Sequence, residues 1–314
     1  MPAIIPFISQ LPDSEQLIWL DELNSILPNE TFDLVKNINA CDRNQCEIAI
    51  VANPSQDDLK LFPNLKWVQS LWAGVENLIQ PSIDQDFKLV RMVDPTLTET
   101  MAEAVLAWSL YLHRKMPSYT IQQKEKVWQP QPYVFPCQCN IGILGLGELG
   151  QASAKRLIDN GFSVMGWSRT KKNIDGLKTF DGKEGLVEML KITNILVCLL
   201  PLTKETRGMI DNNLLAQLPK GASLVNFARG SIVKIDDLIK TLTEKNLYHA
   251  VLDVFEEEPL DPNSPLWDNP RITVLPHIAA TTNIETATKI VAKNILDYRK
   301  TGKINFDVDL KKGY

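Results

Sequence analysis

Three residues in the second half of the sequence have side chains that suit proton transfer and carboxylate recognition. Arg229 follows the apolar run "SLVNFA", Glu258 follows "AVLDV", and His277 follows "ITVLP". A histidine carries a proton near neutral pH, and a neighbouring carboxylate orients the imidazole and favours its protonated form. A guanidinium clamps a carboxylate with two parallel hydrogen bonds. Together these groups suit the protonation of a carbonyl oxygen on a substrate that also carries a carboxylate.

Each of these residues also has an ordinary structural interpretation. Arg229 could instead form an internal ion pair, with Asp253 as the candidate partner. Glu258 ends a run of three glutamates, and such a run is usually solvated surface, so spacing alone does not select its third member. The other two histidines, His113 and His249, lie beside ordinary helix and strand patterns, and we expect both to be structural.

A glycine motif precedes these residues in "IGILGLGELG". Gly145, Gly147 and Gly150 have the G-x-G-x-x-G spacing between an apolar strand and a helix, the context typical of dinucleotide binding. Gly145 would permit the tight turn, Gly147 would let a pyrophosphate approach the backbone, and Gly150 would let helix and strand pack closely. The start of the helix, at Glu148 and Leu149, would supply free N–H groups to the phosphates.

The second strand of this half ends in "GWSRTKK", where an NAD-binding site would have an acidic residue. A hydroxyl and a guanidinium suit a 2′-phosphate, so we expect NADP(H) to be preferred, with NAD(H) as the alternative cofactor. A solvated basic turn is the structural alternative. The loop "CLLPLTKET" after the third strand would line the nucleotide crevice. The expected cofactor contacts beyond the glycine motif are therefore Ser168, Arg169, Thr170, Leu200, Pro201 and Ala228.

The elements around these motifs predict the fold. From Asn140 onward, strands alternate with helices, which indicates a doubly wound parallel sheet of the Rossmann type. The carboxyl ends of parallel strands share one edge, where ligands bind. Arg229, Glu258 and His277, which follow the fourth, fifth and sixth expected strands, should therefore converge at that edge.

The first hundred residues indicate a smaller α/β unit. The segment "DSEQLIWLDELNSIL" predicts a helix with Asp13 or Ser14 as its N-cap, and "EIAIVA", "KWVQSL" and "KLVRMV" predict strands. A long apolar helix, roughly 98–115, precedes a polar loop, 122–136, which we expect at the domain boundary. That loop is either a surface connection or an arm that grips a second subunit. A last long helix ends at Gly302 and should return the chain to the first domain.

Composition excludes several classes of function. The chain has 314 residues, enough for two domains, and its net charge of -5 comes without a basic stripe, so neither nucleic acid nor an anionic membrane is an expected partner. No apolar stretch is long enough to cross a bilayer, and the start lacks a basic signal region, so a cytoplasmic location is expected. Five cysteines do not indicate a disulfide framework. Cys137 and Cys139 have no further ligand nearby in sequence, so no metal site is expected.

At its motifs the chain resembles the D-isomer specific 2-hydroxyacid dehydrogenase family, most closely its glyoxylate/hydroxypyruvate reductase A branch. The segments "GILGLGELG", "NFARGSIV", "LDVFEEEPL" and "PHIAA" match successive signatures of that family, "SPLW" fits the branch, and the likeness extends to the C-terminal "VDLKKGY". The resemblance implies that Arg229, Glu258 and His277 are catalytic, with Glu258 chosen because it directly precedes Pro259.

The resemblance also implies further site residues. In a loop matching "SLWAGVE", the amides of Ala73, Gly74 and Val75 would hold the substrate carboxylate, while the catalytic arginine bridges carboxylate and carbonyl. Many relatives carry a small residue at the position of Trp72, whose indole would either narrow the substrate pocket or pack outward. Asp253 would contact the nicotinamide carboxamide.

The family implies an NADPH-preferring reductase of glyoxylate and hydroxypyruvate that acts as a homodimer. Residues 1–103 and 287–314 would form a flavodoxin-like substrate domain, and residues 104–286 would form the NAD(P)-binding Rossmann domain. One alternative is an NAD(H)-sensing protein of the co-repressor type with vestigial catalysis. Formate dehydrogenase is a second alternative, disfavoured because that family has glutamine at the position of Glu258.

Overall fold

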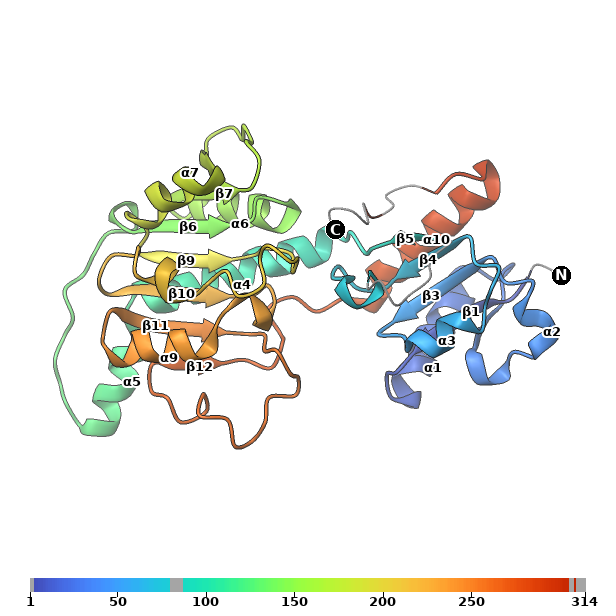
Figure 1. Ribbon diagram of the computed structural model, residues 1–314, viewed down its shortest axis with the longest axis horizontal. Helices are drawn as coiled ribbons and strands as arrows, with labels where there is room; N and C mark the ends of the chain where they lie inside the picture. Colours follow the sequence, from blue (N-terminus) through green and yellow to red (C-terminus); the bar gives the residue numbers. More distant parts are fainter. Residues whose placement is uncertain (1–2, 80–86, 305–307, 309–314) are drawn as a thin grey trace. The chain divides into compact units, whose positions relative to one another are not determined.

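The chain forms two compact units in the computed structural model, which describes residues 3–79, 87–304 and 308 (Figure 1). Unit 1 comprises residues 1–97 and 282–314, and unit 2 comprises residues 98–281. The expected joints, 103/104 and 286/287, lie a few residues further along, inside helices α4 (Pro95–His113) and α10 (Ile284–Thr301). The chain instead changes units near the beginning of each helix. The matched C-terminal segment 308–314 lies outside the described residues, apart from Val308.

Unit 2 is built on a seven-stranded sheet in which every neighbouring pair of strands is parallel. The strand order is β12-β11-β10-β9-β6-β7-β8, so the order reverses between β6 and β9. This doubly wound topology confirms the predicted Rossmann fold. The strands are β6 (Asn140–Leu144), β7 (Ser163–Ser168), β8 (Lys178–Asp181), β9 (Ile195–Cys198), β10 (Ala222–Asn226), β11 (Leu247–Leu252) and β12 (Ile272–Val274).

Both faces of this sheet are buried, which explains the continuous apolar runs of its central strands. In β9, Ile195 and Val197 enter one core cluster, while Leu196 and Cys198 enter the cluster on the opposite face. Helices α4 and α6 pack on the first face, and α7, α8 and α9 pack on the second (Figure 1). Four of these helices are α6 (Glu148–Asp159), α7 (Gly182–Leu190), α8 (Asn212–Leu215) and α9 (Ile235–Thr243).

Strand β8 was absent from the sequence prediction. It pairs with β7 at the edge of the sheet, and its four residues, "KTFD", are only partly buried or exposed. Because an edge strand of this length carries no apolar run, hydrophobic patterning gives no signal for it. The strands that precede Arg229, Glu258 and His277 are therefore the fifth, sixth and seventh of this unit rather than the fourth, fifth and sixth.

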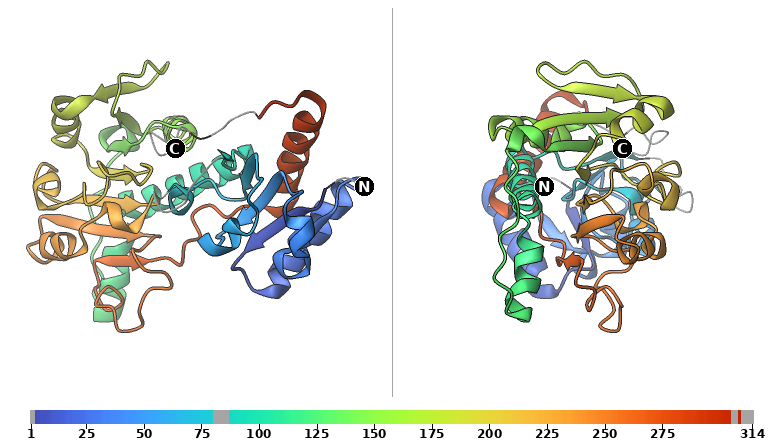
Figure 2. Two further views of the ribbon diagram at one scale, coloured as in Figure 1. Left: turned by 45° about the vertical axis from the view of Figure 1, so that its right-hand side comes forward. Right: turned by 90° about the vertical axis from the view of Figure 1, so that its left-hand side faces the viewer.

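The segment after α4 also differs from its prediction. A left-handed residue, Lys115 with φ of 57°, separates α4 from a second helix, α5 (Met116–Glu125), which takes up the beginning of the expected loop. The two helices run in different directions (Figure 2). Residues 127–135 then form no helix or strand, and within them Trp128 is 99% exposed. We call residues 127–135 the aromatic arm, because it also contains the exposed Tyr133 and Phe135.

Unit 1 has a five-stranded parallel sheet in the order β2-β1-β3-β4-β5, which is the flavodoxin-like order. It confirms the predicted α/β class of this unit. The strands are β1 (Ile5–Ser9), β2 (Phe32–Leu34), β3 (Ile48–Ala52), β4 (Trp67–Ser70) and β5 (Lys88–Val90), of which β1 and β2 were not predicted.

Helices α1 (Asp13–Ile26) and α10 share one face of this sheet, and their apolar residues, including Leu23 and Ile295, belong to one core cluster. Short helices α2 (Ala40–Arg43) and α3 (Gln56–Lys60) complete the unit. The expected N-caps of α1 were wrong, since Pro12 holds that position and Asp13 is already helical. The Asp13 carboxylate pairs with Lys36 at 2.8 Å, and among the described residues no side chain caps this helix.

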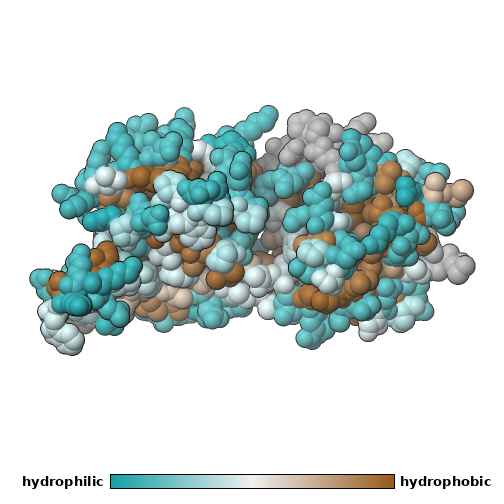
Figure 3. Space-filling view, turned by 90° about the horizontal axis from the view of Figure 1, so that it is seen from below, coloured by the Kyte–Doolittle hydropathy of each residue, from teal (hydrophilic) through white to brown (hydrophobic). Residues whose placement is uncertain are grey.

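Hydrophilic residues cover most of the face drawn in Figure 3, with apolar areas between them. On α10, two exposed ion pairs join residues four positions apart, Lys289 with Glu285 and Lys293 with Asp297. Within the described part of the chain, every helix is too short or too polar to cross a membrane.

Candidate active site

Three neighbouring strands of unit 2 bring the predicted chemical residues to one edge of the sheet. Strands β10, β11 and β12 lie side by side and run parallel. Arg229 follows the carboxyl end of β10, Glu258 lies in the loop after β11, and His277 follows β12. Because carboxyl ends of parallel strands share an edge, residues widely separated in sequence become neighbours.

His277 and Glu258 form a hydrogen-bonded pair. The Nδ1 atom of His277 lies 2.7 Å from Oε2 of Glu258. The other carboxylate oxygen, Oε1, accepts a hydrogen bond of 2.9 Å from the backbone N–H of Phe255. These contacts orient both side chains, and a histidine whose Nδ1 is bonded to a carboxylate has Nε2 as its remaining ring nitrogen.

The structure distinguishes the three consecutive glutamates, which the sequence alone could not. Glu256 is turned away from His277, since it pairs with Arg207 at 3.0 Å and accepts a hydrogen bond from Ser231 at 3.2 Å. Glu257 is exposed. Glu258 is the member of the run that contacts His277.

The contact between His277 and Glu258 shifts the pKa of each side chain toward its charged form. The hydrogen bond that His277 donates to Glu258 raises the pKa of His277 above its ordinary value of 6.5, although burial and the charge of Arg229 oppose the shift. Burial would raise the pKa of Glu258, but hydrogen bonds from His277 and the Phe255 amide, with the charges of His277 and Arg229, outweigh burial and lower it. The arrangement therefore favours an imidazolium beside a carboxylate.

Asp253 holds the turn that carries His277. His277 has φ of 55°, in the left-handed region that residues with a Cβ seldom occupy. Its backbone N–H donates to the Asp253 carbonyl at 3.0 Å, while the amides of Ile278 and Ala279 donate to the two Asp253 carboxylate oxygens at 2.7 and 2.9 Å. Asp253 is 1% exposed, and burial raises its pKa despite these bonds. No pattern in the sequence indicates this anchoring; Asp253 was expected to contact the nicotinamide carboxamide or to pair with Arg229.

Two neighbouring residues, Asn226 and Gly230, shape the turn of Arg229. Buried Asn226 closes this turn, because its amide donates to the Arg229 carbonyl at 3.0 Å and its carbonyl accepts from Ala228 N at 3.2 Å. Gly230 lies so near the loop after β11 that a Cβ there would be 2.0 Å from the Phe255 carbonyl carbon. The loops that carry Arg229 and Glu258 are therefore in backbone contact.

The glycine-rich turn between β6 and α6 has the form expected of a dinucleotide site. Gly145 has φ of 101°, and a Cβ there would lie 2.7 Å from the Leu199 carbonyl oxygen. A Cβ on Gly150 would lie 1.9 Å from the Gly145 carbonyl oxygen, so only glycine lets the helix approach the turn. A Cβ on Gly147 would meet nothing within 4 Å, which leaves open space beside the backbone at the start of α6. Glu148 and Leu149 form the first turn of that helix.

The other expected cofactor residues flank the point where the strand order reverses. Leu200 and Pro201 follow β9, which lies next to β6 and its glycine-rich turn. Ser168 ends β7, and its hydroxyl donates to the Thr170 carbonyl at 2.8 Å. Arg169 and Thr170 are exposed. Ligands of doubly wound sheets bind at this switch point, so the position fits a dinucleotide.

In unit 1, the loop after β4 is pinned around Trp72. Its backbone N–H donates to Ser70 Oγ at 3.0 Å, and its carbonyl accepts from Met92 N at 3.0 Å. The indole packs edge-on against Trp19, with ring centroids 6.3 Å apart, and joins the core of unit 1. Trp72 therefore contributes to the packing beneath this loop.

The next three residues of this loop are the expected substrate-binding amides. Ala73 and Gly74 are half-buried, and Val75 is buried. Within residues 3–79, 87–304 and 308, no group accepts a hydrogen bond from the amides of Ala73, Gly74 or Val75. Consecutive backbone amides without a protein acceptor are typical of an anion site.

The remaining histidines lie away from this edge. His249 Nε2 is 2.8 Å from Thr273 Oγ1, and burial, with Arg271 adding to it, lowers the pKa of His249 to about 4. Burial likewise lowers the pKa of His113, followed by the charges of its neighbours. Both side chains therefore favour the neutral form, which suits packing.

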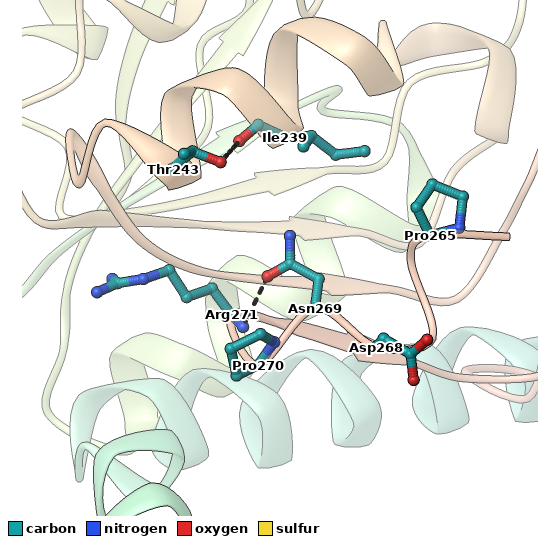
Figure 4. A pocket seen from close by; sticks show the side chains of 7 residues that line it. All are labelled: Ile239, Thr243, Pro265, Asp268, Asn269, Pro270 and Arg271. Carbon is teal, nitrogen blue, oxygen red and sulfur yellow. Dashed lines mark hydrogen bonds between the residues drawn. The ribbon is translucent and has the colours of Figure 1, made fainter.

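A depression of about 480 Å³ lies between α9 and the segment before β12 (Figure 4). Its polar side chains serve the fold, since Thr243 donates to the Ile239 carbonyl at 2.8 Å and Arg271 to the Tyr248 carbonyl at 3.3 Å. Because Arg271 precedes β12, this depression lies at the amino edge of the sheet, opposite the edge of His277.

The chain belongs to the D-isomer specific 2-hydroxyacid dehydrogenase family, since residues 106–279 match the NAD binding domain of that family. It is thus an oxidoreductase with a nicotinamide dinucleotide domain. It is 36% identical, over 96% of its length and 98% of the relative's, to a glyoxylate/hydroxypyruvate reductase A from Yersinia enterocolitica. The match to the family and the likeness to this reductase confirm the resemblance that the sequence motifs indicate.

Solved structures agree with this membership. A family member from Xanthobacter autotrophicus, in complex with NADPH and MES, is 34% identical with a TM-score of 0.92, and the match covers 100% of both chains. An NADPH-dependent glyoxylate/hydroxypyruvate reductase from Sinorhizobium meliloti, in complex with NADP and sulfate, is 31% identical with a TM-score of 0.91, over 99% of this chain and 100% of that one. None of these three relatives is a co-repressor, so the sensor alternative gains no support from them.

Proposed function

We propose that this enzyme reduces small 2-oxoacids with NADPH, converting glyoxylate to glycolate and hydroxypyruvate to D-glycerate. The observation that carries the proposal is the 2.7 Å contact between His277 Nδ1 and Glu258 Oε2, at the sheet edge where Arg229 also follows its strand. The names of the Yersinia and Sinorhizobium relatives support the substrate class.

The glycine-rich turn at Gly145, Gly147 and Gly150 would hold the nicotinamide dinucleotide, which would supply the hydride for the carbonyl carbon of the oxoacid. His277 Nε2 donates a proton to the carbonyl oxygen, so that no alkoxide accumulates, and hydride plus proton complete the alcohol. Glu258 holds the imidazole through Nδ1 and stabilises its charged form. Arg229 binds the substrate carboxylate and polarises the carbonyl, and Asp253 fixes the turn of His277.

Within unit 1, the amides of Ala73, Gly74 and Val75 would bind a carboxylate. Their lack of an acceptor among the described residues supports this role. The preference for NADPH rests on Ser168, Arg169 and Thr170 at the end of β7, where no acidic residue of that strand would repel a 2′-phosphate. The NADPH and NADP complexes of the relatives support it.

One assay tests the whole proposal. Purified enzyme is offered glyoxylate, hydroxypyruvate and pyruvate, first with NADPH and then with NADH, while the absorbance of the reduced nicotinamide is followed. Saturable turnover of the small oxoacids with NADPH supports the proposal. Turnover with NADH alone would contradict the cofactor preference, and binding of dinucleotide without turnover of any oxoacid would contradict the reaction.

The charge state of His277 makes the reduction dependent on pH. Reduction needs the protonated imidazole, so kcat should fall as the pH rises through the raised pKa of His277, above 6.5. The substitution Glu258→Gln removes the carboxylate that raises this pKa and should move the falling limb to lower pH. Glu256→Gln, which alters a glutamate paired with Arg207, is the matched control. An unmoved limb in Glu258→Gln would refute the coupling.

We also propose that the enzyme is a homodimer held in part by the aromatic arm. Trp128 is 99% exposed, and the rings of Tyr133 and Phe135 pack edge-on with their centroids 5.2 Å apart. Three exposed aromatic side chains form a large apolar group for a solvated loop. Burial of one such side chain contributes about 3 kcal/mol, so Trp128→Ser should weaken the dimer by roughly a hundredfold in sedimentation experiments. Trp267→Ser, an exposed tryptophan outside the arm, is the control. A wild-type monomer at micromolar concentration would overturn the proposal.

A cytoplasmic location is the last part of the proposal. All five cysteines are unpaired, which suits a reducing compartment. Recovery of the activity in a secreted or membrane fraction of the cell would contradict it.

A further inference from the structure

Two side chains hold one carbonyl group inside the glycine-rich turn. The Leu146 carbonyl oxygen accepts a hydrogen bond from Lys172 Nζ at 2.7 Å and another from Gln151 Nε2 at 3.0 Å. The Leu146 side chain is buried, and it fills the space above Gly166, where a Cβ would lie 2.3 Å from Leu146 Cδ2. Leu146 is therefore fixed through both its side chain and its carbonyl.

A fixed carbonyl also fixes the next amide. The peptide bond between Leu146 and Gly147 is planar, and in a trans peptide the N–H points opposite to the carbonyl. The Gly147 N–H finds no acceptor among the residues that the structure describes, and open space surrounds the position where a Cβ would lie. This amide is thus directed into the open space beside the start of α6, where an anion would bind.

Lys172 contacts the Leu146 carbonyl from the segment that is expected to bind the 2′-phosphate. It follows Ser168, Arg169 and Thr170 in sequence, and its own carbonyl is held by Thr179 Oγ1 of β8 at 2.7 Å. Lys172 is half-buried, and no carboxylate in the described ranges pairs with it. A half-buried ammonium that bonds a neutral carbonyl is an unusual use of a charge, because its desolvation is only partly offset.

We propose that Lys172 is a positioning residue of the cofactor site: its bond to Leu146 sets the Leu146–Gly147 peptide so that the Gly147 N–H binds the cofactor diphosphate. The same bond ties the 2′-phosphate segment after β7 to the diphosphate turn after β6. The inference rests on the proposed nicotinamide cofactor. It differs from a direct contact of Lys172 with the 2′-phosphate, because the diphosphate is common to NADPH and NADH.

Binding of the two cofactors separates these roles. In Lys172→Met, which keeps the length of the stem and removes the donor, the Kd values of NADPH and NADH, measured by calorimetry, should rise by the same factor, about tenfold. Lys172→Arg retains a charged donor and should restore most of the affinity. Lys171→Met, which changes the exposed neighbour, should leave both Kd values nearly unchanged. At saturating cofactor, the control Lys171→Met should retain the kcat of the wild type.

Two results would overturn the inference. A loss confined to NADPH would show that Lys172 contacts the 2′-phosphate directly, and unchanged Kd values for both cofactors would show that the bond to Leu146 is dispensable. If Lys172→Met unfolds, Lys172→Ala, which also removes the donor, replaces it in the same comparison. Failure of the wild type to bind either dinucleotide would instead refute the proposed function, so the two failures are distinct.

Discussion

The variant His277→Asn is expected to lower kcat for glyoxylate reduction by about a hundredfold or more, the usual contribution of a positioned general acid. Asparagine is chosen because it tolerates the left-handed backbone at this position, where φ is 55°. The turn held by Asp253 should therefore persist while the proton donor is lost. Steady-state kinetics with saturating NADPH measure the effect.

A comparison with His277→Ala separates chemistry from backbone conformation. Alanine removes the same proton donor but is less compatible with the left-handed turn, so it should lose the same activity and some stability as well. The affinity for NADPH should stay close to that of the wild type in both variants, because the proposed diphosphate contacts lie at the glycine-rich turn and not at His277. Near-normal turnover in either variant would remove His277 from the mechanism.

The variant Arg229→Lys is expected to raise KM for the oxoacid by roughly tenfold to a hundredfold, the cost of a lost charge-assisted hydrogen bond. Lysine keeps the charge, but a single ammonium cannot reproduce the planar fork that binds carboxylate through two parallel bonds. The guanidinium geometry is set locally, since Arg229 Nη1 donates to the Ala228 carbonyl at 2.6 Å. Lysine has no second nitrogen to keep that bond while holding the substrate.

Arg207→Lys is the matched control for this experiment. Arg207 lies in the same unit, but it pairs with Glu256 at 3.0 Å and is exposed. Its replacement should leave KM and kcat nearly unchanged. A KM for glyoxylate in Arg229→Lys equal to that of the wild type would show that Arg229 does not recognise the carboxylate.

The sequence predicted the strands whose apolar runs are long and missed those whose runs are short or interrupted. Central strands such as β9 and β10 are buried on both faces, so each reads as a continuous apolar segment. Strand β8 lies at the exposed edge of its sheet. Strand β1 contains Pro6, and a proline argues against a central strand, although β1 pairs with a strand on each side. Missing the edge strand β8 changed only the count of strands, because Arg229, Glu258 and His277 follow strands that the sequence did predict.

The site was predictable in its residue types and not in its fine geometry. A glycine motif in its strand and helix context, and three polar residues after apolar runs, suffice to place a dinucleotide and an acid near one sheet edge. Choosing Glu258 from three glutamates needed the resemblance to a family. The bonds from Asp253 to the amides of Ile278 and Ala279 depend on how two loops approach each other, and no local pattern encodes that approach.

The path of α10 has a consequence for the order in which the chain can assemble. The core beside α1 in unit 1 includes Val291 and Ile295 of α10. Unit 2 is one continuous stretch of sequence that lies between the two segments of unit 1. A ribosome therefore completes every residue of unit 2 before it makes the helix that finishes unit 1. While unit 2 is being synthesised, the apolar surface of α1 that later meets α10 has no partner, so unit 1 is the part of this enzyme whose core is exposed longest to water and to other chains.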